Sequence, residues 1–245
     1  MTARVWKYGL PLFVAAFVLS LFWHMPANVL WATIVSPNTG LRQSETFGTA
    51  WTGGATGVAL GQIPIGRLYH EIKLSALGRG ALAVDWKVVS PHSQGQGAVA
   101  VSLNEQRFNG TALTARLQGL PLMVPAAGDV KVEISEAVFK SGKCTVVVGN
   151  ILVAGQLQVL GGPQIRLNGP IACVDQKLRI DLSGIMGDMP TRLSIDQTDS
   201  MTAEIRVQLS DVPSAQSAML TSLGFERRGE LHELVQVMRA DELDL

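Results

Sequence analysis

The sequence predicts a mainly β protein, with a single N-terminal transmembrane helix, an antiparallel β-rich exported domain and one short C-terminal helix. Three observations predict this fold class. A long N-terminal stretch is uncharged, period-two alternation dominates the rest, and Gly, Pro, Asn and Ser clusters separate the alternating segments. The 245 residues carry a formal net charge of zero, with 47% apolar and 16% charged residues. This balance excludes a disordered chain and lacks the basic excess of a nucleic-acid-binding protein.

The N-terminal stretch from Tyr8 to Leu41 contains no Asp, Glu, Lys or Arg. Its apolar run over residues 9–31 is long enough for a bilayer core, which needs about 20 apolar residues. We therefore expect a cytoplasmic N-terminus over 1–8, an anchor over 9–31 and a linker over 32–43. A cleaved signal peptide is the alternative, but large residues crowd the place where a small-x-small cleavage site would lie. A buried core helix is a weaker alternative, because such helices seldom lack charge on every face.

Two cations, Arg4 and Lys7, precede the apolar run, and no positive charge follows until Arg42. By the positive-inside rule, this asymmetry keeps the N-terminus cytoplasmic and exports the remainder of the chain. Two aromatic pairs would then form the interfacial belts: Trp6 with Tyr8, and Trp23 with Trp31.

The exported part, residues 44–245, is dominated by alternation of apolar and polar residues, which is typical of strands with one buried face. The clearest segments are 130–134, 178–182, 193–195 and 205–209, and further candidates are 71–77, 80–89, 97–103 and 109–117. They recur with too little room for helical crossovers, which favours an antiparallel meander. The Gly-rich stretches 78–80 and 95–97 are interpreted as turns. The acidic residues 241–245 are interpreted as a solvated end.

One soluble helix is expected over residues 213–223. Pro213 suits its first turn, and Gly224 suits the left-handed position after its end. A long sheet with a single helix must cover its apolar face in another way. Either the sheet curves or folds over on itself, or it leaves a groove that a partner or lipid fills. The sequence leaves both possibilities open.

Cys144 and Cys173 are the only cysteines, and both lie in the exported part. An even number of cysteines outside the cytoplasm permits one disulfide. Two buried free thiols, which behave as small apolar side chains, are the alternative. Neither cysteine belongs to a CxxC pair, so we expect no redox or zinc site.

No motif in the sequence supports catalysis. The four histidines (His24, His70, His92 and His232) have no metal-ligand spacing, and there is no GxSxG nucleophile elbow. Residues 141–144 contain a Gly-Lys pair but lack the earlier glycine of a phosphate-binding loop. Glu133, Asp181 and Asp196 occupy the polar phase of strands, where a solvated role is expected. We therefore expect a non-enzymatic protein without catalytic, cofactor-binding or metal-binding residues.

The segment 47–55, FGTAWTGGA, lies shortly after the expected membrane exit. It resembles the G-T-x-W-[ST]-G-x-A signature of the type II secretion system protein N (GspN) family, with Gly48, Thr49, Trp51 and Gly53 at motif positions. Looser similarities are found at 85–87, at 167–170 with Cys173, and at 223–225 followed by 229–238. The glycines permit tight turns, and Trp51 offers a large anchor for a core or an interface. The G-x-x-W-x-G opening is also similar to that of AsmA- and TamB-like envelope proteins, whose long sheets form lipid grooves.

The resemblance implies a single-pass inner-membrane component of the type II secretion system, with a periplasmic domain that acts in assembly or bridging. Its partners would be other secretion-system subunits, in the inner membrane or periplasm, and membrane lipid. We expect no cofactor and no nucleic acid. Strand edges could pair with a strand of a partner by β-augmentation. The alternative function is lipid handling through an apolar β groove.

Overall fold

The computed structural model describes residues 2–35, 41–60, 63–118, 126–157, 162–199 and 202–239. The helical segments are α1 (Thr2–Trp23), α2 (Ala27–Leu30), the π-helical turn η1 (Trp31–Val35), the 3₁₀ helix η2 (Leu74–Arg79) and α4 (Ser214–Ser222). The strands are β1 (Leu41–Arg42), β2 (Glu45–Gly48), β3 (Thr52–Leu60), β4 (Ile63–Lys73), β5 (Leu82–Val89), β6 (Ser93–Val101), β7 (Glu105–Gln118), β8 (Ala126–Lys140), β9 (Lys143–Leu157), β10 (Gln164–Val174), β11 (Lys177–Met186), β12 (Met189–Gln197), β13 (Thr202–Leu209), β14 (Glu226–Arg228) and β15 (Leu231–Arg239).

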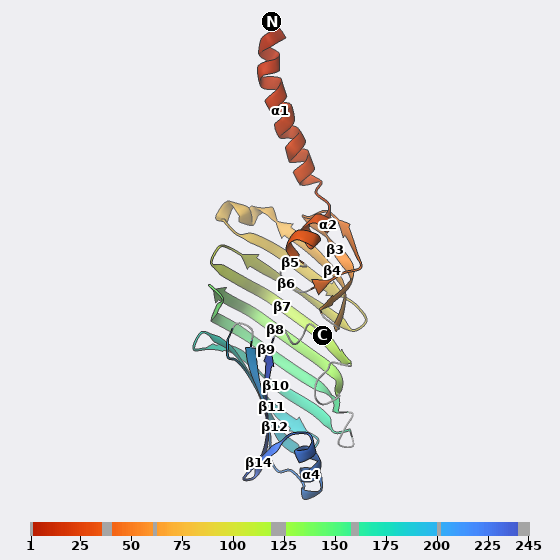
Figure 1. The fold of residues 1–245 in the computed structure, drawn as a ribbon, viewed down its shortest axis with the longest axis vertical. Coiled ribbons are helices and arrows are strands. Elements are labelled where there is room, and N and C mark those ends of the chain that lie inside the picture. Colours follow the sequence, from red (N-terminus) through yellow and green to blue (C-terminus); the bar gives the residue numbers. More distant parts are fainter. Residues whose placement is uncertain are drawn as a thin grey trace.

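All fifteen strands belong to one sheet, and α1 projects away from one end of it (Figure 1). From β3 to β13 each strand is the neighbour of the next one along the chain, and the described strand pairs are antiparallel. The expected antiparallel meander is confirmed. The expected C-terminal helix is also confirmed, as α4.

The helix α1 ends at Trp23, before the expected end of the anchor at residue 31. Pro26 accounts for this end, because proline lacks a backbone N–H and disfavours helical geometry in the residue before it. The chain then turns back, and Trp31 packs against Ala55 and Val58 of β3 with 1% of its surface exposed. Trp31 is therefore a core residue rather than the interfacial residue that we expected. Trp23, in contrast, is 57% exposed at the end of α1.

In the part of the chain that the structure describes, no helix is long and apolar enough to cross a membrane. The anchor over residues 9–31 therefore stays a prediction, and so does the orientation set by Arg4 and Lys7, whose side chains lie outside the described residues. The expected linker over 32–43 contains η1 and the short strand β1.

The strand register places the apolar side chains of the alternating segments on one face of the sheet. Leu113 lies opposite Val132, and Val132 lies opposite Ile151, so these side chains share that face. The two ends of the same face are covered, one by α2 and η1 around Trp31 and the other by α4 around Leu220. Charged side chains occupy the opposite face, on which exposed ion pairs such as Arg116–Asp129 join neighbouring strands.

Two local expectations are wrong. The candidate strand over 71–77 ends at Lys73, where η2 begins. The stretch 95–97, expected to be a turn, lies inside β6. A Cβ on Gly95 would come within 2.7 Å of a methyl carbon of Leu113, so this glycine leaves room for a side chain of the next strand.

Candidate functional site: the helix–sheet junction and the adjoining hollow

The signature segment forms β2, a tight turn and the start of β3. Gly48 has a φ of 77°, a left-handed conformation that favours glycine. The Thr49 N–H donates to the Thr52 carbonyl oxygen at 2.9 Å and closes the turn. A Cβ on Gly53 would lie 2.7 Å from the Thr49 carbonyl oxygen, so the backbone can approach closely only without a side chain. Gly48 and Gly53 therefore allow a tight turn that residues with a side chain would strain.

Trp51 joins this turn to the end of α1. Its indole N–H donates to the Phe22 carbonyl oxygen at 3.0 Å, and the two rings lie 4.5 Å apart between centroids. The Ala50 N–H beside it donates to the Met25 carbonyl oxygen at 2.8 Å. The Trp51 carbonyl accepts a hydrogen bond from the Ile72 N–H at 2.7 Å. These bonds fix the last turn of α1 to both β3 and β4.

His70 lies buried beneath the junction, on β4. Its Nε2 lies 3.2 Å from the Ala50 carbonyl oxygen, so a neutral ring with the proton on Nε2 donates there. Its Nδ1 is buried and has no hydrogen-bond partner among the described residues. Burial lowers the pKa of His70 from its ordinary value of 6.5, although hydrogen bonds to the Ala50 and Thr49 backbone oppose this shift. The junction therefore holds a neutral histidine.

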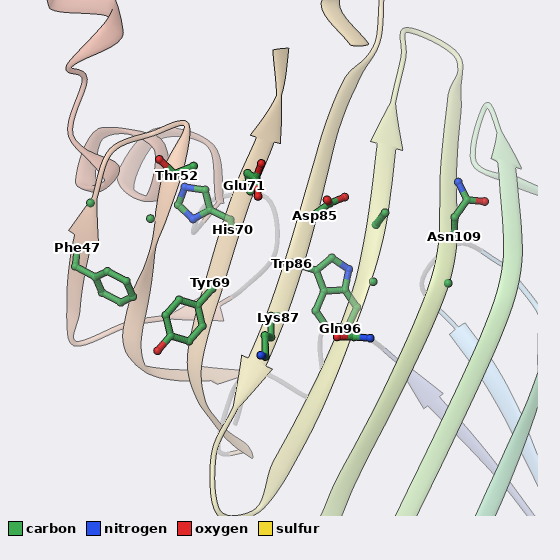
Figure 2. Close-up of a pocket in the computed structure, with 15 residues that line it drawn as sticks. Phe47, Thr52, Tyr69, His70, Glu71, Asp85, Trp86, Lys87, Gln96 and Asn109 are labelled. Atoms are coloured by element: carbon green, nitrogen blue, oxygen red, sulfur yellow. The ribbon is translucent and has the colours of Figure 1, made fainter. Parts of the chain in front are cut away.

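A hollow of about 730 Å³ adjoins the junction (Figure 2). It is lined by residues from β2 to β7: Phe47, Gly48, Thr52, Gly53, Tyr69, His70, Glu71, Asp85, Trp86, Lys87, Gln96, Gly97, Ala98, Asn109 and Gly110. Phe47 and Tyr69 make an edge-to-face contact with their ring centroids 5.6 Å apart. A Cβ on Gly54 would lie 2.7 Å from the tip of the Phe47 ring, so this glycine gives the ring its place. Small residues elsewhere, such as Ala98 and Gly110, leave the space open.

The two carboxylates of the hollow are tied to one cation. Glu71 lies opposite Asp85 in the β4–β5 register, and Lys73 Nζ lies 2.6 Å from a Glu71 oxygen and 3.2 Å from an Asp85 oxygen. Hydrogen bonds to Glu71 and Asp85 raise the pKa of Lys73 above its ordinary value of 10.5. Both carboxylates of the hollow are therefore held in ion pairs with the same lysine.

The remaining expected site residues lie elsewhere. Cys144 and Cys173 form a disulfide between β9 and β10, just beyond the last backbone pair of these strands, Ile171 with Gly149. It lies on strands remote from the junction. Among the described residues, no group of three or more His, Cys, Asp or Glu side chains is arranged to hold a metal ion. His24 lies just after α1, His92 lies between β5 and β6, and His232 lies on β15.

Sequence reasoning missed the partners of the signature. Phe22 lies 29 positions before Trp51, and His70 lies 20 positions after Ala50. Neither residue belongs to a motif, and no spacing in the sequence indicates these contacts. The only available signal was the density of glycines in the signature itself.

The fold and the junction together define a protein with one N-terminal helix attached to the end of a single long antiparallel sheet. Residues 39–230 match the family model described as type II secretion system (T2SS), protein N. Because this match covers most of the chain, the protein belongs to that family and is a type II secretion component, which indicates an envelope-associated location. No curated protein and no solved structure matches the chain. The match begins after η1 and ends before β15, so it covers the sheet from β1 to β14.

Proposed function

We propose that the protein is a non-enzymatic, inner-membrane-anchored component of the type II secretion system that acts in assembly or bridging through its periplasmic sheet. The junction at Trp51 is the observation that carries this proposal. It fixes α1, on which Leu12, Phe13 and Leu19 are 65–73% exposed, to the end of the sheet. Exposed apolar side chains on one helix need an apolar environment, such as a bilayer or another protein. The sheet would then extend from the membrane toward its partners.

The polar face of the sheet is suited to contacts with other secretion-system subunits. Its ion pairs, such as Lys131–Glu133, join side chains that are about half exposed. Exposed pairs contribute only about 0–1 kcal/mol each, so a partner can exchange them at little cost. The hollow beside the junction adds three aromatic side chains, Phe47, Tyr69 and Trp86, and the amides of Gln96 and Asn109. We propose this hollow as part of the partner-binding surface.

A deletion strain complemented with the tagged full-length chain tests the proposal. We expect deletion to impair exoprotein export, and other secretion-system subunits to co-purify with the chain from detergent-solubilised envelopes. The chain should also stay with membranes during alkaline extraction. Normal export after deletion, together with no co-purifying subunit, would contradict the proposal.

A matched pair of glycine variants connects this test to the junction. Gly53→Ala places a Cβ against the backbone of the signature turn, whereas Gly78→Ala places one where nothing lies within 4 Å. Complementation should fail or weaken with Gly53→Ala and succeed with Gly78→Ala, at equal levels of protein. Equal export by the two variants would show that the structure of the junction is not required for export.

Lipid handling is a second candidate function, favoured by the apolar face of the sheet. Between the two covered ends, Val132, Val153 and Leu193 are only partly buried, and no described helix lies over them. A partly exposed apolar face of this length is suited to acyl chains. Native mass spectrometry of the full chain released from detergent tests this candidate. Retained phospholipid that is lost on Val132→Asp would favour it, and a lipid-free protein would contradict it.

A further inference from the structure

The hollow beside the junction is elongated and runs across the strands. The strand registers place the side chains of its walls in two rows between β2 and β7 (Figure 2). One row contains Phe47, Tyr69, Lys87 and Gln96, and the other contains Thr52, Glu71, Asp85, Ala98 and Asn109. Because β3, β4, β5 and β6 lie between β2 and β7, the hollow is about 24 Å long.

The width of the hollow admits a single narrow chain. Its two rows are separated by two residues along each strand, which corresponds to about 7 Å. Gly53 and Gly97 lie between the rows and leave the floor without side chains at these positions. An α-helix is about 10–12 Å wide with its side chains, so it does not fit between the rows. Each of β4, β5 and β6 is hydrogen-bonded to a strand on both sides, so an added strand cannot pair with the floor.

The charges of the hollow cancel. Glu71 and Asp85 line it, and the Lys73 ammonium group contacts both carboxylates. Lys87 supplies a second cation, which has no carboxylate partner among the described residues. The rim adds two acids and two bases, which are Glu45, Glu136, Arg67 and Arg107. This balance is complementary to an uncharged ligand, whereas a phosphate group would face two carboxylates.

The walls of the hollow offer both donors and acceptors of hydrogen bonds. The two carboxylates accept, the Lys87 ammonium group donates, and the amides of Gln96 and Asn109 do both. Neither amide side chain is used in a hydrogen bond among the described residues. The hydroxyls of a sugar likewise donate and accept. A proline-rich segment, in contrast, offers few N–H donors to the carboxylates, and an acyl chain would bury these polar groups without partners.

We propose that the hollow binds a linear, uncharged oligosaccharide chain along its two rows. The rings of Phe47, which is 38% exposed, and Tyr69 contact the C–H groups of one sugar. The hydroxyls of the following sugars donate to Glu71 and Asp85 and accept from Lys87. A single sugar would fill only part of this length. The inference goes beyond the proposed function, because it adds a glycan to the partners of the polar face and is tested without measuring export.

Isothermal titration calorimetry of the full chain tests this proposal, in a detergent without a sugar headgroup. The probes are cellotetraose and tetra-N-acetylchitotetraose, two straight, uncharged chains that distinguish plain from N-acetylated sugars. We expect saturable binding of at least one tetramer and much weaker binding of its monosaccharide. Tyr69→Ala should weaken tetramer binding about tenfold, because it removes a ring of the aromatic pair. Asn109→Ala, at an exposed position where folding is little affected, should weaken it about three- to tenfold through the lost hydrogen bond.

Two variants outside the hollow are the controls and should bind as the unmodified chain does. Phe108→Ala removes a ring from another edge-to-face pair, with centroids 6.1 Å apart, and Asn104→Ala removes an exposed amide after β6. Absence of saturable binding of both tetramers would overturn the proposal, and so would equal binding by the hollow variants and the controls. Loss of a co-purifying secretion-system subunit with Tyr69→Ala, in a chain that binds neither tetramer, would also overturn it and assign the hollow to a protein segment.

Discussion

At the scale of single residues, the glycines of the signature stand where a side chain would collide with neighbouring atoms or where the backbone has a positive φ. Gly48 takes a left-handed conformation, Gly53 admits the Thr49 carbonyl, and Gly54 gives space to the Phe47 ring. Trp51 uses both its ring and its N–H to hold the last turn of α1. The glycine density was visible in the sequence, but the contacts that require it were not.

The first prediction concerns Gly53→Ala. The added Cβ meets backbone atoms, which cannot move aside as a flexible side chain can, so we expect a loss of about 1–3 kcal/mol of stability. Thermal unfolding followed by circular dichroism measures this loss, at about 2–4 °C in Tm per kcal/mol. Gly78→Ala is the matched control and should stay within about 0.5 kcal/mol of the unmodified chain. Equal Tm values for the two variants would refute the steric explanation.

The second prediction concerns the pH dependence that His70 confers. Burial lowers the pKa of His70 in the folded state below the value of 6.5 in the unfolded state. The unfolded chain therefore binds more protons at acid pH, and this contribution to stability is lost as the pH falls below about 6.5. His70→Gln cannot be protonated and should show a smaller decrease in Tm between about pH 7.5 and pH 5.

The exposed His92→Gln provides the control for this comparison. It should keep the pH dependence of the unmodified chain. If His70→Gln and the unmodified chain lose the same Tm on acidification, His70 does not titrate as its burial predicts.

At the scale of elements, local alternation and tertiary pairing contribute differently. The alternating segments 130–134, 178–182 and 205–209 lie within β8, β11 and β13, so a period of two was enough to find these strands. β3 was missed because its glycines interrupt the alternation, and β9 was missed because a run of valines obscures it. β3 and β9 form strands because each is hydrogen-bonded to a neighbouring strand on both sides.

The third prediction concerns the disulfide that joins β9 to β10. Cys144 and Cys173 are 29 positions apart, and closing a loop of this length in the unfolded chain gives about 2–4 kcal/mol of stability. The double variant Cys144→Ser, Cys173→Ser should lose about this amount in denaturant unfolding. Reductant should lower the stability of the unmodified chain and leave the double variant unchanged. A stability of the unmodified chain that is insensitive to reductant would contradict this prediction.

At the scale of the whole molecule, one junction connects a helix and a sheet of different character. The helix α1 exposes apolar side chains, whereas the sheet has one apolar and one polar face. Both ends of the apolar face are covered, by Trp31 near α1 and by Leu220 of α4 at the far end. The contact of Trp51 with the end of α1 therefore fixes the position of the helix relative to the sheet.

The fourth prediction is that Trp51→Ala releases α1 from the sheet. The variant loses the ring contact and the hydrogen bond to Phe22, while the pairing of β3 with β4 remains. Limited proteolysis with mass spectrometry should show several-fold faster cleavage around residues 24–26, with little change in Tm. Trp23→Ala, whose ring is 57% exposed at the same helix end, is the control and should be cleaved at the normal rate. Equal cleavage of all three chains would show that Trp51 does not hold the helix.

The sequence by itself determined the mainly β, antiparallel character of the fold, several of its strands and the C-terminal helix, because alternation, turn residues and helix-end signals are local. It also identified the signature residues and the family resemblance. Only the tertiary structure decided that Trp31 is buried, that Cys144 pairs with Cys173 and that Trp51 meets Phe22. These features join residues distant along the chain, and their contacts depend on strand register, which no local pattern encodes.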